Sequence, residues 1–336
     1  MRRLLQRLPA AIVAACLIAI AAPAAAQRLE ASDKQEVLDA IERVLTRQAF
    51  VPGVDFTTWP AHLGSRRASV DAATTPRSFL YAVNRILREF GVSHCRVDLD
   101  EGGGTPLMAQ EPSSGGRPAS ELTWLADGTA VVRVRTFGAD YKRDSIDALF
   151  EEASKAPRLI LDLRSNGGGL VGNLQHLMGY LLPPGSVMGT FVTRRTATAF
   201  ESATGGDATD LAAIAEWSRS KLRVRSRSEA VFAGKIAVLV NRGTGSASEM
   251  AAAALRDVLG APIVGSATAG AVLGSTYSAL PHGFRLQYPA QDYVTAKGVR
   301  LEGHPLVPDA EVRTRGFGEK DPVLDAARQL LVGQSR

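Results

Sequence analysis

The stretch KIAVLVNRGTGSASEMAAAALRD, residues 235–257, decides the fold. Residues 236–240 are apolar and partly β-branched, a pattern that predicts a buried strand. The alanine- and leucine-rich run from Glu249 to Leu255 favours a helix. Two glycines and two serines lie between these runs, so we expect a tight strand-to-helix turn with Ser246 near the helix N-terminus.

Ser246 in this turn has two interpretations. Serine is a favoured N-cap residue, so Ser246 could simply cap the helix. Alternatively, the turn lifts the hydroxyl out of the sheet and points the unpaired amides of the first helical turn at a bound ligand. A serine so placed attacks a carbonyl if a base takes its proton and amides stabilise the oxyanion. This stretch alone leaves both interpretations open.

The first 26 residues are typical of a secretory signal peptide. Three arginines precede a core of alanine, leucine and isoleucine, and Ala24-Ala25-Ala26 follows, which predicts cleavage after Ala26. Val13 to Cys16 also resembles a lipobox. The lipoprotein alternative is less favoured, because the apolar run continues beyond Cys16. We therefore expect an exported protein, periplasmic or secreted.

Removal of this segment changes the charge and leaves 310 residues. The formal charge falls from +5 to +2, because the segment carries three arginines and no acids. No nucleic-acid partner follows from so small a charge. No other stretch is long and apolar enough to span a bilayer. Cys95 is the only remaining cysteine, so an internal disulfide is excluded.

Strands and helices alternate along the rest of the chain, which predicts an α/β fold. Residues 27–92 form a helical N-terminal region, with a loop expected at 51–63, and residues 93–336 form the core. A polar segment at about 196–228 indicates an insertion, and a glycine- and proline-rich stretch at 102–120 indicates a mobile loop.

Gly167, Gly169 and Gly172 spell G-x-G-x-x-G between a predicted strand and a predicted helix. This is a dinucleotide-binding pattern, and Arg194 and Arg195 follow the next strand, where a phosphate could lie. Export argues against a nicotinamide cofactor. Glycines at a strand end also let backbone amides approach a substrate closely, as an oxyanion hole requires.

His94 is a candidate general base, since histidine titrates near neutral pH; a structural histidine is the plain alternative. Neighbouring residues of an extended segment point to opposite faces, so we expect Cys95 to be a buried small side chain and not a partner of His94.

Glu302 could orient an imidazole or be a solvated loop acid. The remaining histidines show no metal-ligand spacing, and we expect neither a metal nor a cofactor.

Three blocks together resemble the tail-specific (C-terminal-processing) serine peptidase family. They are Leu161 to Gly169, Val238 to Asp257, and Leu301-Glu302-Gly303 through Pro308-Asp309. In that family the serine followed by Ala-Ser-Glu is the nucleophile, which here is Ser246. The resemblance implies a crotonase-like α/β core of stacked β-β-α units with a small N-terminal helical appendage.

Two departures point to one branch of the family. Its lysine-using members carry the base in a glycine turn, which here is residues 265–271 and holds alanine in place of lysine. About forty residues separate His94 from the core strand at Val131, too few for an inserted PDZ domain. The tricorn-core and retinoid-binding-protein-like branch instead takes a histidine from an upstream turn, which Ser93-His94 resembles.

The resemblance thus implies an exported serine peptidase with a Ser-His-Glu-type mechanism. Ser246 is the implied nucleophile and His94 the base, while Glu302, with Ser93, orients the imidazole; amides of Ala247 and of Gly168 or Gly169 form the oxyanion hole. The implied partner is a peptide or protein substrate, and a homo-oligomer is left open. The alternative is a catalytically inactive relative that binds peptides or apolar ligands in the same cleft.

Overall fold

The structure is a computed structural model that describes residues 28–100, 116–225, 232–312 and 321–333. The expected signal peptide, with the lipobox alternative at Cys16, lies outside these residues, as does most of the loop expected at 102–120. Among the described residues, no helix combines the length and apolarity needed to cross a bilayer.

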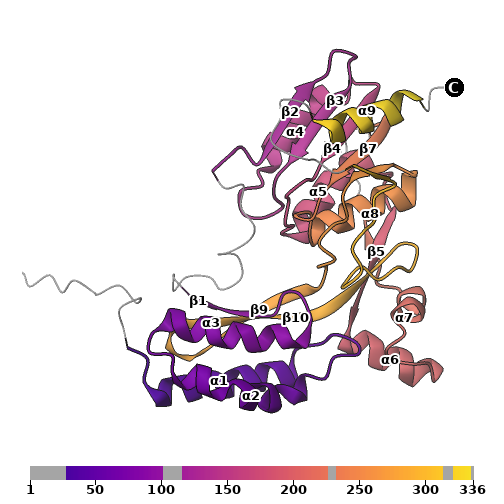
Figure 1. Cartoon of the computed structure of the whole chain (residues 1–336). Helices are drawn as coiled ribbons and strands as arrows, with labels where there is room; N and C mark the ends of the chain where they lie inside the picture. The colour runs from indigo at the N-terminus through magenta and orange to yellow at the C-terminus, as the bar shows by residue number, and fades with distance from the viewer. Residues whose placement is uncertain (1–27, 101–115, 226–231, 313–320, 334–336) are drawn as a thin grey trace, which may run out of the picture.

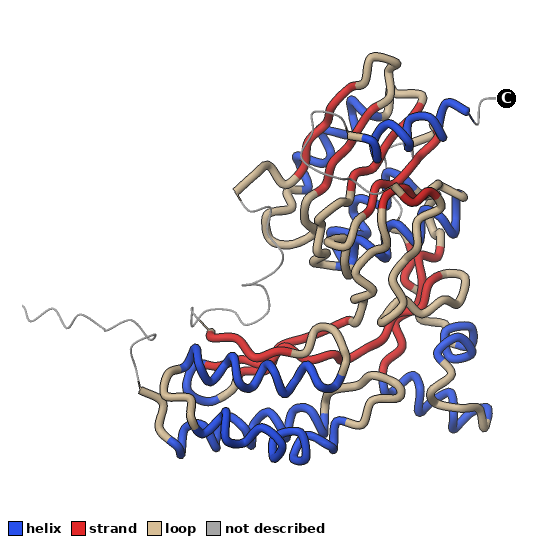
Figure 2. The backbone as a smooth tube through the Cα atoms, in the orientation of Figure 1, coloured by secondary structure: helices blue, strands red, loops and turns tan. Residues whose placement is uncertain are grey.

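Helices and strands alternate through most of the chain (Figures 1 and 2). The helices are α1 (Ala31–Arg47), α2 (Trp59–Asp71), α3 (Pro76–Leu87), α4 (Arg143–Ala153), α5 (Val171–Leu181), α6 (Arg194–Thr204), α7 (Leu211–Trp217), α8 (Ala247–Leu259) and α9 (Pro322–Gly333). The strands are β1 (Arg96–Leu99), β2 (Ser120–Trp124), β3 (Ala130–Val134), β4 (Arg158–Asp162), β5 (Val187–Thr193), β6 (Leu222–Arg223), β7 (Lys235–Val240), β8 (Ile263–Gly265), β9 (Gly274–Ala279), β10 (Phe284–Thr295) and β11 (Ala310–Glu311). Short 3₁₀ turns lie at Phe56–Thr58, Arg88–Phe90 and Pro281–Gly283.

Six strands form a core sheet in the order β11-β8-β7-β4-β3-β2. All neighbouring pairs in it are parallel except β2 with β3, which form an antiparallel hairpin around Gly128. Because the carboxyl ends of parallel strands meet at one edge, the loops after β4 and β7 lie side by side. These two loops hold Gly167–Gly169 and Ser246.

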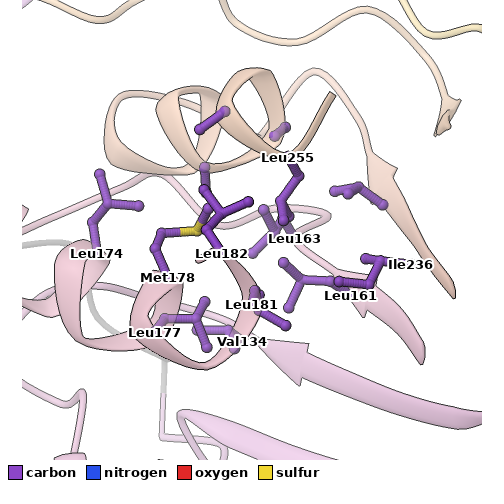
Figure 3. Packing of buried hydrophobic residues seen from close by; sticks show 14 of the residues in the cluster. Val134, Leu161, Leu163, Leu174, Leu177, Met178, Leu181, Leu182, Ile236 and Leu255 are labelled. Atoms are coloured by element: carbon purple, nitrogen blue, oxygen red, sulfur yellow. The ribbon is translucent and has the colours of Figure 1, made fainter. Parts of the chain in front are cut away.

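The core sheet is buried on both faces, as the continuous apolar runs of its strands require. Leu161 and Val238 point to the face covered by α5 and α8, and Ile160 and Leu239 point to the face covered by α9. Figure 3 shows side chains of α5, α8 and the strands interlocked, with Met178 and Leu182 central among them. The buried alanines of α8 let this helix approach its neighbours closely.

A second, antiparallel sheet, here called the platform sheet, has the order β1-β10-β5-β6, with β9 also paired to β10. Helices α1 to α3 cover one of its faces (Figure 1), and their apolar side chains form one cluster with Leu286, Phe284 and Tyr288 of β10. The long strand β10 therefore joins the N-terminal helices to β5 and the rest of the chain.

The predicted α/β class is confirmed, and one local prediction is wrong. The loop expected at 51–63 contains a 3₁₀ turn and the start of α2, because Pro60 lies in the first helical turn, where its missing N–H costs nothing. The segment at about 196–228, which the sequence indicates as an insertion, begins inside α6 and includes α7. Thr193 caps α6, and Ala197 and Phe200 pack on α7.

Candidate active site

Ser246 lies between β7 and α8 in a strained backbone conformation, with φ 54° and ψ −124°. Its N–H donates to the carbonyl of Ala271 at 2.8 Å and to Oε2 of Glu249 at 3.2 Å. A non-glycine residue with positive φ costs about 1–3 kcal/mol and persists only where its surroundings impose it. The position is therefore the N-cap of α8, as expected, and also a turn held under strain.

Glu249 is the buried carboxylate that organises this turn. Besides the Ser246 N–H, it accepts hydrogen bonds from the hydroxyl of Thr268 at 2.5 Å and from the N–H groups of Gly270 and Ala271 at 2.8 and 2.9 Å. Burial raises the pKa of Glu249, and the four hydrogen bonds counter that rise. The carboxylate thus ties the start of α8 to residues 268–271, the loop that faces Ser246.

The glycine run after β4 packs directly against Ser246. A Cβ on Gly168 would lie 2.5 Å from the Cβ of Ser246, and one on Gly169 would lie 2.2 Å from the backbone of Phe137. Both glycines have positive φ, 100° and 138°. Only glycine fits at these two positions, because any side chain would collide with the Ser246 turn or with the neighbouring backbone.

The backbone N–H groups of Ala247 and Gly169 have no hydrogen-bond acceptor among the described residues. The N–H of Gly168 donates to Oδ1 of Asn166 at 2.9 Å. Asn166 is fully buried, and its amide also donates to the carbonyl of Val134 at 3.0 Å. Of the two glycine alternatives for the oxyanion hole, Gly169 therefore has the available donor.

On the other side of the site, Glu302, Ser93 and His94 form a chain of contacts. Glu302 accepts the Ser93 N–H at 2.8 Å and the Ser93 hydroxyl at 2.9 Å, and it also accepts the N–H of Val272 at 2.9 Å. The Ser93 hydroxyl lies 2.7 Å from Nδ1 of His94. An ionised carboxylate only accepts, so the Ser93 proton points to Glu302 and its oxygen accepts from Nδ1–H. The lone pair of His94 is then on Nε2.

His94 also has positive φ, 56°, and is half-buried. Burial lowers the pKa of His94, Glu302 opposes that effect, and Arg96 adds to it. The imidazole is therefore neutral at pH 7, which is the state that a general base requires.

Ser93, His94, Ser246, Ala247 and Gly169 line one cavity of about 560 Å³. No hydrogen bond joins the imidazole of His94 to the hydroxyl of Ser246 in this conformation of the described residues, and such bonds often tighten only when substrate binds. The cavity also has apolar walls from Leu170, Val171, Phe191 and Met250. Glu302 lies behind Ser93, outside this lining.

The other sequence candidates lie elsewhere or have simpler roles. Cys95 is buried in the apolar cluster below the platform sheet, as expected, and it also borders the cavity; burial raises the pKa of its thiol to about 12. Arg194 donates to the carbonyl of Ala49 and lies over the ring of Phe50, so it does not face Gly169. Within the described ranges, no cluster of three or more potential metal ligands exists and no lysine lines the cavity.

Sequence reasoning missed Asn166 and Glu249. Ser246 and Glu249 have the S-x-x-E spacing of a capping box, a signal that could have identified the buried carboxylate. Asn166 carries no comparable signal, because its bond to the Gly168 N–H is an ordinary local turn contact and its bond to the Val134 carbonyl joins segments that only the fold brings together.

Comparison with known proteins identifies the family of the chain. The sequence model of peptidase family S41 matches residues 128–312, more than half of the chain. A "Carboxyl-terminal-processing protease" of Synechocystis sp. is 29% identical over 261 residues, which are 76% of this chain and 52% of that protein. The chain thus spans about half the length of that curated relative.

Solved structures share the fold. A structure from Parabacteroides merdae covers 89% of this chain with a TM-score of 0.63 at 17% identity, and 97% of that chain is matched. The photosystem II D1 C-terminal processing protease covers 89% with a TM-score of 0.51 at 15% identity, again with 97% of that chain matched. The resemblance to tail-specific peptidases is confirmed at the family level, and this chain belongs to peptidase family S41.

Proposed function

We propose that this chain is a serine peptidase that hydrolyses peptide bonds by a Ser-His-Glu-type mechanism. One observation carries the proposal: the contact chain from Glu302 through Ser93 to His94 ends at the cavity that Ser246 also lines. The substrate is a peptide or protein, bound against the apolar walls of this cavity. No cofactor or metal takes part.

In the proposed reaction, Oγ of Ser246 attacks the scissile carbonyl carbon and Nε2 of His94 takes the hydroxyl proton. The tetrahedral intermediate collapses as the imidazolium returns that proton to the leaving amine, which gives an acyl-enzyme. Water then attacks the ester with His94 again as the base, and the acid product leaves. Glu302 acts through Ser93, stabilising the orientation and the positive charge of the imidazolium.

The oxyanion of both intermediates binds to the N–H groups of Ala247 and Gly169. Their availability beside Ser246 supports this assignment. Asn166 contributes indirectly, because its contacts to Gly168 and Val134 fix the glycine run.

The finer assignments are also part of the proposal. The chain belongs to the tricorn-core and retinoid-binding-protein-like branch, its core is crotonase-like, and residues 27–92 and 93–336 are its two structural regions, with an insertion at about 196–228. The cavity contains Ser93-His94 and no lysine among its described residues, which supports that branch. We further propose export to the periplasm or beyond, on the pattern of residues 1–26.

A fluorophosphonate probe tests the proposal, because only an activated serine reacts quickly with it. We expect the full chain to be labelled, with the adduct mapped by mass spectrometry to Ser246 and not to Ser93 or Ser275, whose hydroxyls lie in the same cavity. Ser246→Ala should abolish labelling and the cleavage of peptide mixtures, and Ser154→Ala, at the C-cap of α4, should change neither. An unlabelled wild-type protein that binds peptides would instead indicate the inactive relative.

A further inference from the structure

A tight turn at the end of β10 returns the chain toward the active site. The N–H of Thr295 donates to the carbonyl of Val299 at 2.9 Å, and Val294 pairs with Arg300 in an antiparallel bridge. Glu302 follows Arg300 by two residues, and Asp292 precedes Val294 by two residues on β10. The return segment that carries Glu302 thus runs beside the strand that carries a second acid.

These two carboxylates are both buried: Asp292 is 0% exposed and Glu302 is 6% exposed. Two buried like charges at neighbouring positions repel each other. Burial raises the pKa of Asp292, and the charge of Glu302 adds to that rise, while Arg300 and the N–H of Tyr293 oppose it. The placement of Glu302 therefore depends on how the charge of Asp292 is balanced.

Arg300 is the cation paired with Asp292. Its Nε and Nη2 lie 2.9 and 2.7 Å from Oδ2 of Asp292, and the N–H of Tyr293 donates to Oδ1 at 2.8 Å. No other cation of the described ranges makes a salt bridge with Asp292 or Glu302. Arg300 also precedes Glu302 by two residues, so its contact with β10 pins the segment that presents Glu302.

The other charged or titratable groups around Glu302 do not replace Arg300. His94 reaches Glu302 only through Ser93, and Nδ1 of His304 contacts the Glu302 carbonyl, not its carboxylate. On the α8 side, Glu249 is bound to Gly270 and Ala271, and Arg96 of β1 pairs with Asp98.

We propose that Arg300 is a positioning residue: by neutralising Asp292, it allows Glu302 to hold Ser93 where the Ser93 oxygen presents the imidazole of His94 to the cavity. This inference rests on the proposed function and extends it to a pair that touches neither substrate nor Ser246. The proposed role of Arg300 differs from a packing role, because the loss of activity on removing Arg300 would come from the unbalanced charge of Asp292.

The test compares single and double variants by fluorophosphonate labelling rate and by kcat and KM on a cleaved peptide. Arg300→Met should lower kcat and the labelling rate about 10- to 100-fold at pH 7.5, with KM changed little, because the catalytic groups are misplaced. Arg300→Lys should retain most activity. Arg300→Met combined with Asp292→Asn should recover most of the loss, since the unbalanced charge is gone.

The pH dependence supplies a second readout. The ratio of the wild-type rate to the Arg300→Met rate should shrink as the pH falls, because protonation of Asp292 removes the repulsion. Arg158→Met is the matched control: Arg158 is partly buried and bonded to the carbonyl of Asp127 and to Thr129, at the far end of β4. The ratio of the wild-type rate to the Arg158→Met rate should stay near one at every pH.

Each outcome is decisive. Recovery in the double variant together with a pH-dependent ratio supports the role of Arg300. A pH-independent loss that Asp292→Asn does not recover in a folded protein would overturn it, as would an unaltered Arg300→Met rate. If wild-type protein is not labelled at all, the proposed function itself fails; if it is labelled and only these variants disagree, the failure is confined to Arg300.

Discussion

The two halves of the candidate site are built differently. The Ser246 half is one strand, one turn and one helix, residues 235–259, with the glycine run packed against it. The His94 half joins Ser93, Val272 and Glu302, which come from three separate segments around the platform sheet. A local motif positions the hydroxyl, whereas long-range contacts position the imidazole.

This difference indicates which kinds of substitution should damage each half of the site. The Ser246 half depends on backbone geometry that only certain residues adopt, so a single methyl group added to one of its glycines should damage it. The His94 half depends on hydrogen bonds and charges between segments, so changes that preserve shape but remove a bond or a charge should damage it. Four predictions test this contrast.

The largest effect is expected in the His94 half. His94→Gln keeps a polar side chain of similar size but removes the base, so kcat/KM should fall by about 10⁴-fold or more. His282→Gln is the control, because His282 also has positive φ, 58°, but lies on the 3₁₀ turn before β10 and contacts Glu36. A loss of less than tenfold in His94→Gln would contradict the assignment of the base.

A smaller loss is expected from one added methyl group in the Ser246 half. Gly168→Ala forces a Cβ to within 2.5 Å of Ser246 at a φ of 100°, so we expect a loss of about 10²-fold in kcat/KM and about 1–3 kcal/mol in the free energy of unfolding. Gly172→Ala is the matched control. Its Cβ would meet only Nη2 of Arg143, at 3.5 Å, and equal losses in both variants would refute the contrast.

The third prediction concerns the fall of kcat/KM at acidic pH. Burial lowers the pKa of His94, so the neutral imidazole persists below the ordinary histidine value of about 6.5. The midpoint of the acid limb of kcat/KM should accordingly lie below pH 6.5 and be measurable from pH 4.5 to 8. A midpoint above 6.5 would show that Glu302, and not burial, dominates the environment of the ring.

The smallest effects are expected for substitutions of the two lysines that would be candidates for the base of a Ser-Lys mechanism. Lys235 and Lys297 are both exposed and do not line the cavity. Changing either to Met should alter kcat/KM by less than about twofold, the range of ordinary surface substitutions. A large loss at either position would require a lysine base and would remove the contrast between the two halves.

Sequence reasoning reached the strands and the turn that holds Ser246, because these follow from patterns within a few residues, whereas the choice of Ser246 as the nucleophile came from the family resemblance. It also named Ser93, His94 and Glu302 through the family resemblance. It could not find Asn166 or the Asp292–Arg300 pair, since their contacts join positions that are distant or unremarkable in the chain. The availability of the Gly169 N–H, and not that of Gly168, likewise depends on the Asn166 side chain.

The sequence by itself determined the alternation of strands and helices and the strand-turn-helix with Ser246, because apolar runs, glycines and helix formers act locally. Only the tertiary structure decided which tautomer His94 adopts, which amide is available beside Ser246, and that Arg300 pairs with the buried Asp292. Those properties arise from burial and from contacts across up to 209 positions of the chain, and no local pattern encodes them.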